Sequence, residues 1–255
     1  METRITRLGG KSCFIGNEHP LAIIGERINP TGKKKLTQEL SKGDFSMVRH
    51  FAFTQAKAGA HIIDINVGAA GVDEKKVLPL AVRIVMETVD LPLSIDSANP
   101  KALEAALKIY KGRAVINSVT GEMKSLDTIL PLVKKYKAVV LGLTFDESGP
   151  QNDPQTRFEV AKKILKEAQR YGIPQEDVLI DCLARPVSLG KEEARCTLEA
   201  IKLVNQELGV NTVLGISNIS FGLPDRKFLN AAFLAMAVAQ GLNCAILDPT
   251  INLMK

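Results

Sequence analysis

Short apolar runs recur along the chain, and each of them ends on a carboxylate or carboxamide side chain. The runs are rich in Val and Ile and cover residues 21–29, 61–68, 91–97, 114–120, 138–145, 178–184, 211–220 and 244–249. Apolar residues occupy consecutive positions in them, which is typical of strands covered on both faces in a parallel sheet. We therefore predict eight parallel strands.

The segments between the runs have helical spacing instead. After Pro154, apolar residues at 158, 161, 164, 165 and 168 would share one face of a helix, and Gly172 ends the segment. Asn99 followed by Pro100 is a start signal for another helix. Strands and helices alternate throughout, so the sequence predicts an α/β fold.

A (β/α)8 TIM barrel accounts for this alternation better than a doubly wound sheet. A doubly wound sheet usually carries a glycine-rich phosphate turn after its first strand, but the chain has GERINPTGKKK there and contains no GxGxxG motif. Successive strand ends lie roughly twenty to forty residues apart, the length of one strand, one helix and two loops. We expect a short N-terminal arm at 1–20 and the barrel at 21–255, with a closing C-terminal helix that is short or missing.

The composition agrees with one domain that has a large core. The 255 residues are 45% hydrophobic and 24% charged, and single barrels of this length are common. The apolar stretches, such as AVVLGL at 138–143, are far shorter than the ~20 residues that span a bilayer. Residues 1–20 lack a signal-peptide pattern. We therefore expect a soluble, cytoplasmic protein without a membrane partner.

The patterns of cysteine, histidine and charge disfavour several other classes. The four cysteines contain no CxxC pair and the three histidines lie apart from them, so neither a zinc site nor a disulfide framework is expected. The net charge of +5 is modest, and the 5% of aromatic residues are not interleaved with basic ones, which argues against nucleic-acid binding. The Lys33-Lys34-Lys35 run is typical of a solvated loop, and its alternative role is to attract an anionic substrate tail or an acidic partner.

Polar side chains stand at the C-terminal end of every predicted strand. They are Glu26 and Asn29, Asp64 and Asn66, Asp96, Asn117, Asp146, Asp181, Asn218 and Asp248. In a barrel these ends form one rim, where barrel enzymes place their chemistry. Carboxylates within a barrel need hydrogen-bond donors for their oxygens. A heterocycle with a ring N–H beside an exocyclic NH2 offers two such donors in parallel. A Mg²⁺ or Mn²⁺ site is the alternative, although no histidine ends a strand, as we would expect of a barrel metal site.

The motifs at these strand ends resemble those of one enzyme family. In order, they are GERINPTGKKK, DINVG, LSIDS, VINS, LTFDESG, IDCLA and GISNISFG. Their order and spacing are similar to those of the pterin-binding barrel of methyltetrahydrofolate:corrinoid protein methyltransferases. The resemblance covers roughly residues 21–250 and extends to the folate module of cobalamin-dependent methionine synthase. Dihydropteroate synthase is a more distant relative.

The resemblance implies roles for individual rim residues. Asp96, Asn117 and Asp181 would hold the pterin ring, with Asp181 taking its N3–H and 2-amino group. Asn218 would lie beside N5, the atom that carries the methyl group, and is the candidate catalytic residue. The simpler alternative is that these four side chains only bond to loop backbone at the strand ends. Residues with possible supporting roles are Glu26, Asn29, Asp64, Asn66 and Asp146.

The implied activity is transfer of a methyl group between N5 of methyltetrahydrofolate and the cobalt of a corrinoid, in either direction. No DxHxxG cobalamin motif surrounds any of the three histidines, so the corrinoid would be carried by a separate protein. Related methyltransferases are commonly homodimers, and we expect the same here, with folate as substrate and no metal bound by this chain. A dihydropteroate synthase-like enzyme is an alternative, but the basic GxSRK-type motif of those enzymes is replaced by GISNIS. A non-catalytic folate-binding subunit is another.

Overall fold

Eight parallel strands close into a barrel in a computed structural model, which describes residues 1–251. The barrel strands are β3 (Ala22–Ile28), β4 (Ile62–Asn66), β5 (Leu93–Asp96), β7 (Val115–Thr120), β8 (Val139–Leu143), β9 (Val178–Asp181), β10 (Thr212–Gly215) and β11 (Cys244–Leu247). β11 pairs with β3 and closes the ring. The predicted (β/α)8 barrel is confirmed, and each strand lies within one of the predicted apolar runs.

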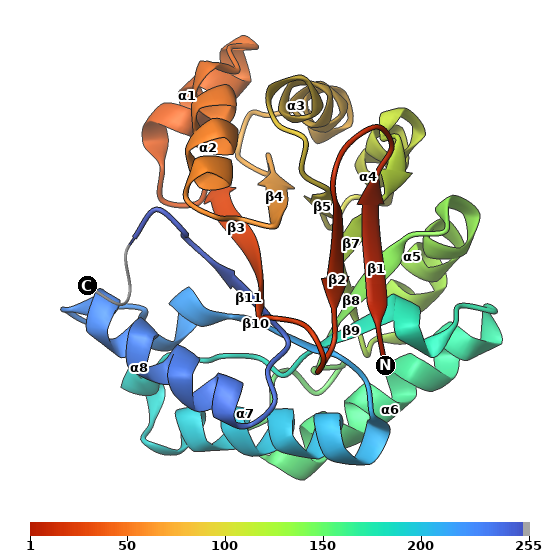
Figure 1. Ribbon diagram of the computed structural model, residues 1–255, viewed down its shortest axis with the longest axis vertical. Coiled ribbons are helices and arrows are strands. Elements are labelled where there is room, and N and C mark those ends of the chain that lie inside the picture. Colours follow the sequence, from red (N-terminus) through yellow and green to blue (C-terminus); the bar gives the residue numbers. More distant parts are fainter. Residues whose placement is uncertain (252–255) are drawn as a thin grey trace.

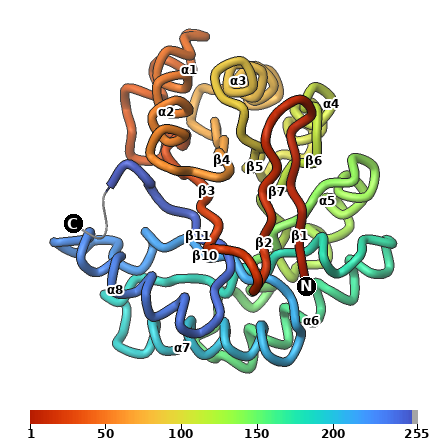
Figure 2. Tube along the Cα trace, viewed as in Figure 1, coloured from red at the N-terminus to blue at the C-terminus, as the bar shows by residue number. Residues whose placement is uncertain are grey.

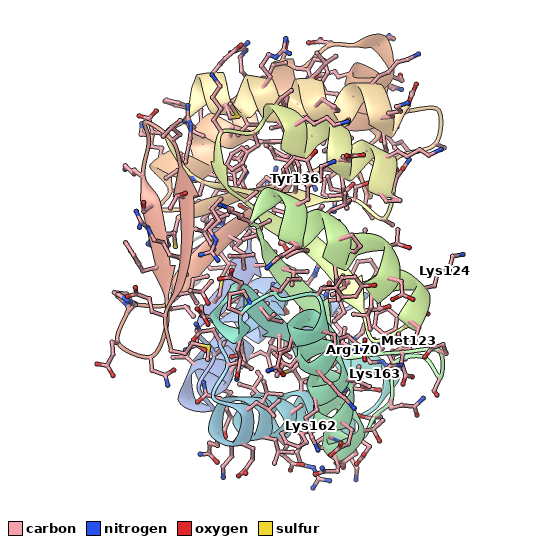
Figure 3. The ribbon with its side chains drawn as sticks, turned by 90° about the vertical axis from the view of Figure 1, so that its right-hand side faces the viewer. Met123, Lys124, Tyr136, Lys162, Lys163 and Arg170 are labelled. Atoms are coloured by element: carbon pink, nitrogen blue, oxygen red, sulfur yellow. The ribbon has the colours of Figure 1, made fainter. Side chains whose placement is uncertain are left out.

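Helices surround the barrel as an outer ring (Figures 1 and 2). They are α1 (Lys34–Lys42), α2 (Ser46–Lys57), α3 (Glu74–Thr88), α4 (Pro100–Ile109), α5 (Met123–Tyr136), α6 (Pro154–Arg170), α7 (Glu192–Leu203) and α8 (Arg226–Ala239). The predicted start of α4 is confirmed, because Asn99 Oδ1 accepts hydrogen bonds from the backbone N–H groups of Lys101 and Ala102. Basic side chains such as Lys124, Lys162 and Arg170 lie at separate places on the outer surfaces of α5 and α6 (Figure 3).

The N-terminal arm forms an antiparallel hairpin of β1 (Thr3–Arg7) and β2 (Ser12–Ile15), drawn in red in Figure 1. β1 also pairs with the short strand β6 (Gly112–Arg113). Ile5 and Ile15 are fully buried and belong to the same core cluster as Ile62 and Val115, which begin β4 and β7. The hairpin therefore covers the N-terminal ends of the barrel strands and leaves the C-terminal ends for a site.

A turn at Asp248–Ile251 follows the last barrel strand. The expected shortness of a closing C-terminal helix concerns residues 250–255, of which 252–255 lie outside the described residues. Within residues 1–251, none of the helices combines the length and apolar character that a membrane span requires.

Candidate functional site

Three neighbouring strands present amide and carboxylate side chains at one level of the rim. Strand register aligns Asn66 of β4 with Asp96 of β5, and Asp96 with Asn117 of β7. The Asn66 side chain also hydrogen-bonds to the Asp96 carboxylate, and its Oδ1 accepts the Gly68 N–H at 2.8 Å. The rim therefore carries a contiguous row of a carboxamide, a carboxylate and a second carboxamide.

Asp64 lies two residues before Asn66 on β4, and its side chain supports this row. Its Oδ1 accepts hydrogen bonds from Ser94 Oγ at 2.6 Å and from Asn117 Nδ2 at 3.2 Å. Burial, followed by the nearby charge of Asp96, raises the pKa of Asp64 well above its ordinary value. Because Asp64 Oδ1 accepts a hydrogen bond from the Asn117 amide, Asp64 orients that amide.

Asp96 and Asn117 face one cavity of about 510 Å³. The peptide bond between Asn117 and Ser118 is cis, and Ser118 lines the same cavity. Burial is the main cause that raises the pKa of Asp96 to about 6, while the hydrogen bond from Asn66 acts in the opposite direction. At neutral pH the Asp96 carboxyl is therefore mainly ionised, and it can accept hydrogen bonds from a ligand.

Asp181 ends β9 and is only 7% exposed. Its carboxylate accepts the Leu183 N–H at 2.7 Å and a second backbone N–H from Gly215. Burial raises the pKa of Asp181 to about 6, and these two bonds together with the charge of Arg157 limit the rise. A carboxylate has about four lone-pair sites, so about two acceptor sites of Asp181 remain beyond these two bonds.

Arg157 on α6 fixes the backbone that bonds to Asp181. Leu183 has a left-handed φ of 59°, which costs a residue with a side chain about 1–2 kcal/mol. The fully buried Arg157 donates from Nη1 to the carbonyl oxygens of Cys182 and Leu183, both at 2.7 Å. Thr197 Oγ1 donates to the same Leu183 oxygen at 2.8 Å. These bonds hold the Leu183 N–H toward Asp181.

A second cavity of about 630 Å³ lies between β3, α8 and the 3₁₀ turn η4 (Ile216–Ser220). Asn218 lines it and is exposed, and its amide makes no hydrogen bond to any other side chain or backbone group of residues 1–251. A Cβ at Gly215 would lie 3.0 Å from Asn218 Nδ2. Gly215 thus gives its N–H to Asp181, and its lack of a side chain leaves room for the Asn218 amide.

Glu26 on β3 and Asp248 just after β11 both have partners within this second cavity. Glu26 Oε1 accepts a 2.5 Å hydrogen bond from Ser217 Oγ, the residue before Asn218. Burial raises the pKa of Glu26, the Ser217 bond opposes this, and the charge of Asp248 adds to it. Asp248 Oδ2 lies 2.9 Å from Arg27 Nη1 in an ion pair.

Two further predicted rim residues shape loops. Asn29 Oδ1 accepts the Thr31 N–H at 2.9 Å, and Asp146 Oδ1 accepts the Ser148 N–H at 2.9 Å. Each of these hydrogen bonds forms an Asx turn, which orders the start of a rim loop. Neither side chain donates to or accepts from the Asp96, Asp181 or Asn218 side chains.

The structure groups the four strongest sequence candidates only in part. Asp96 and Asn117 share the first cavity, Asn218 lines the second, and Asp181 lies on the strand between β8 and β10 and lines neither. Among the described residues, no three His, Cys, Asp or Glu side chains are grouped so that they could hold a metal ion.

Sequence reasoning missed the residues that orient these candidates. Ser94 bonds to Asp64, Ser217 bonds to Glu26, and Arg157 holds the backbone of Leu183, whose N–H bonds to Asp181. A signal existed for Arg157, which lies four residues before Ala161 and seven before Ile164 and so shares their buried helix face. A cation on such a face needs buried acceptors, as it finds here.

The chain is similar to several known proteins. Residues 25–248 match the family model described as "Pterin binding enzyme". The chain is 32% identical over 238 residues to a methylcorrinoid:tetrahydrofolate methyltransferase of Eubacterium limosum, covering 90% of this chain and 86% of that one. It is 34% identical over 240 residues to methionine synthase of Mycobacterium leprae (strain TN), covering 88% of this chain but only 20% of the synthase.

Solved structures with the same architecture include dihydropteroate synthases. The dihydropteroate synthase of Xanthomonas albilineans in complex with 7,8-dihydropteroate superposes with a TM-score of 0.69 over 98% of this chain and 95% of that chain. The two sequences are 19% identical, so this likeness concerns the fold.

Proposed function

The chain belongs to the pterin-binding enzyme family, and we propose that it is a methyltransferase acting between tetrahydrofolate and a corrinoid. In this proposal a methyl group moves between N5 of the folate and the cobalt of a corrinoid carried by a separate protein. The observation that carries the proposal is the 32% identity to a methylcorrinoid:tetrahydrofolate methyltransferase over 86% of that enzyme's length. The rim supplies residues suited to both binding and chemistry.

The carboxylates of β5 and β9 are suited to a neutral pterin ring. Asp96 and Asp181 form no ion pair with a cation of residues 1–251, and both retain acceptor capacity. The N3–H and 2-amino group of a pterin would give Asp181 two parallel donors, which is the strong, directional form of such a contact. Asp96 and the Asn117 amide would bond to the remaining polar atoms of the ring.

Asn218 is suited to the reacting nitrogen. If the methyl group leaves N5 without protonation, the nitrogen departs as an unstable anion, so N5 needs a proton before or during transfer. An amide cannot supply that proton, but the Asn218 oxygen can accept a hydrogen bond from protonated N5 and stabilise it by about 2–4 kcal/mol. The turn that carries Asn218 is held by the bond between Ser217 and Glu26. When bound, the corrinoid supplies the cobalt that accepts or donates the methyl group.

We further propose that the enzyme acts in the cytoplasm as a homodimer. All four cysteines are free and buried, as is usual for proteins of reducing compartments. On α8, Phe228 is 69% exposed and Met236 is 52% exposed, and apolar side chains of this size are commonly covered in oligomers.

Absorbance spectroscopy tests the enzyme assignment. We expect that mixing the protein with tetrahydrofolate and methylcob(III)alamin, or with a methylated corrinoid protein, yields the spectrum of cob(I)alamin. Measurable folate binding without this spectral change, over a range of corrinoid donors, would contradict the assignment and favour a folate-binding subunit. Formation of dihydropteroate from a dihydropterin pyrophosphate and p-aminobenzoate would favour the dihydropteroate synthase alternative instead.

A further inference from the structure

The basic run at residues 33–35 is divided by the fold. Lys34 and Lys35 begin α1 and are exposed to solvent. Lys33 precedes the helix, is half-buried and lines the same cavity as Asn218. Its Nζ donates to the Asn29 carbonyl oxygen at 3.0 Å. The structure therefore separates one inward lysine from two that face solvent.

Arg226, the first residue of α8, places a second cation on this cavity. Its Nε donates to Ser220 Oγ at 3.0 Å and its Nη2 to the Ser217 carbonyl oxygen at 2.8 Å. Its guanidinium lies 5.5 Å from the ring centroid of Phe221, which is 61% exposed. These contacts fix the guanidinium beside an open aromatic face and leave Nη1 without a hydrogen bond to residues 1–251.

The two cations have no direct carboxylate partner. Asp248 is paired with Arg27 at 2.9 Å, and Glu26 is bonded to Ser217. Neither Lys33 nor Arg226 lies within 4.0 Å of a carboxylate oxygen of residues 1–251. Burial and the charge of Arg27 lower the pKa of Lys33, and the charges of Glu26 and Asp248 oppose this only in part, so its ammonium would gain from a further anionic neighbour. The cavity therefore has unpaired positive charge next to the proposed reacting residue.

We propose that this cavity binds the p-aminobenzoyl-glutamate tail of the folate, with Lys33 and Arg226 as partners for its carboxylates. The inference rests on the proposed function, because it takes N5 of the pterin to lie beside Asn218. The folate side chain is attached to C6, the carbon bonded to N5, so the tail leaves the ring at the Asn218 end. The Phe221 face would contact the aminobenzoyl ring, since aromatic rings pack well face to edge or offset.

The concave shape favours a substrate tail over an acidic partner protein. The cavity of about 630 Å³ is within the size range of small-molecule sites. Lys33 is half-buried at its wall, whereas a protein surface would meet the exposed Lys34 and Lys35 first.

Binding measurements on the full chain test the tail site, with Lys33→Met and Lys33→Glu as variants and Lys34→Met as the matched control. Arg226 is left unchanged because it also holds the Ser217 carbonyl. The ligands are 6-methyltetrahydropterin, which has no tail, tetrahydrofolate, and its triglutamate form. Isothermal titration calorimetry gives the Kd for each combination of protein variant and ligand.

We expect the parent protein to bind tetrahydrofolate at least about tenfold more tightly than the tailless pterin, and the triglutamate more tightly still. Lys33→Met should weaken tetrahydrofolate binding by about tenfold, the scale of one charged hydrogen bond, and Lys33→Glu by more. Both variants should bind 6-methyltetrahydropterin like the parent, which also shows that the pterin site is intact. Lys34→Met should match the parent for every ligand.

Other outcomes overturn the inference in distinguishable ways. Equal weakening of all three ligands by Lys33→Met would mean that Lys33 only supports the fold of the rim, and unchanged affinities would mean that the tail lies elsewhere. Unchanged folate affinity with slower methyl transfer from a methylated corrinoid protein, but not from free methylcobalamin, would assign Lys33 to partner docking. If the parent bound none of the three ligands, the proposed function itself would fail.

Discussion

The two halves of the rim differ in whether cations accompany their acidic side chains. On β4, β5 and β9, Asp64, Asp96 and Asp181 are bonded to serine, asparagine and backbone N–H groups. Around β3, β11 and α8, Glu26 is also bonded to a serine, but Asp248 is paired with Arg27 and further cations line the cavity. The first half therefore offers acceptors to neutral N–H donors, and the second offers positive charge to an anion.

This difference follows from the energetics of buried charge. An ionised carboxyl is costly to bury unless donors compensate for the lost water, and partial compensation leaves its pKa raised. The pKa values of about 6 for Asp96 and Asp181 are the sign of such partial compensation. A ligand that brings the missing donors is favoured there, whereas a second anion is not. The division matches a substrate with a neutral ring at one end and carboxylates at the other.

Among changes to the first half of the rim, removal of the Asp181 carboxylate should reduce folate affinity the most. Asp181→Asn keeps the volume but places an NH2 group beside the Leu183 and Gly215 N–H groups and the proposed donors of the pterin. We expect folate affinity to fall at least about a hundredfold, because buried donors would be left unpaired. Calorimetry measures this loss, and Glu159→Gln, on the solvent side of α6, is the isosteric control with the same change in charge.

Affinity that stays within a few-fold of the parent in Asp181→Asn would contradict the assignment of β9 to the pterin edge. Asp96 and Asn117 would then have to bind the ring without Asp181.

A change of pH should alter folate affinity less than the Asp181→Asn substitution does. The raised pKa values of Asp96 and Asp181 mean that the folded state holds protons which the unfolded state has already lost between about pH 4 and 6. These two groups therefore contribute stability at low pH that is lost as pH rises through about 6. Folate binding should have the opposite trend, because a protonated carboxyl no longer accepts two donors.

Titrations between pH 5 and 7 check this expectation. Affinity for folate should rise by about tenfold or more over this range and level off above it. Asp96→Asn should give a flatter profile, since it removes one of the two titrating groups. An affinity that is constant from pH 5 to 7 would show that binding does not depend on either carboxylate.

The strands of the barrel could be predicted because burial on both faces leaves a continuous apolar run. The boundary of β10 could not, because the run at 211–220 continues past Gly215 into the 3₁₀ turn η4. Ile216 and Ile219 remain buried there at a spacing of three residues, which fits that turn as well as their apolar character fits a strand. Asn218 was thus expected on a strand and instead lies on a turn.

Individual site residues could be predicted from strand ends, but their relations could not. The alignment of Asn66, Asp96 and Asn117 depends on register between strands, which spacing along the chain does not specify. The inward direction of Lys33 depends on where α1 begins, and its neighbours Lys34 and Lys35 have the same side chain. Long-range contacts such as that of Ser217 with Glu26, 191 residues apart, have no local signal.

The most direct test of the account is to compare binding and transfer in Asn218→Ala, because Asn218 is proposed to act on N5 rather than to hold the ring. We predict a Kd for tetrahydrofolate within about threefold of the parent and a methyl-transfer rate reduced by roughly 30-fold to 1,000-fold, as expected for a loss of about 2–4 kcal/mol in the transition state. The rate is followed by the absorbance of cob(I)alamin in single turnovers. Transfer at the parent rate in Asn218→Ala would contradict the account.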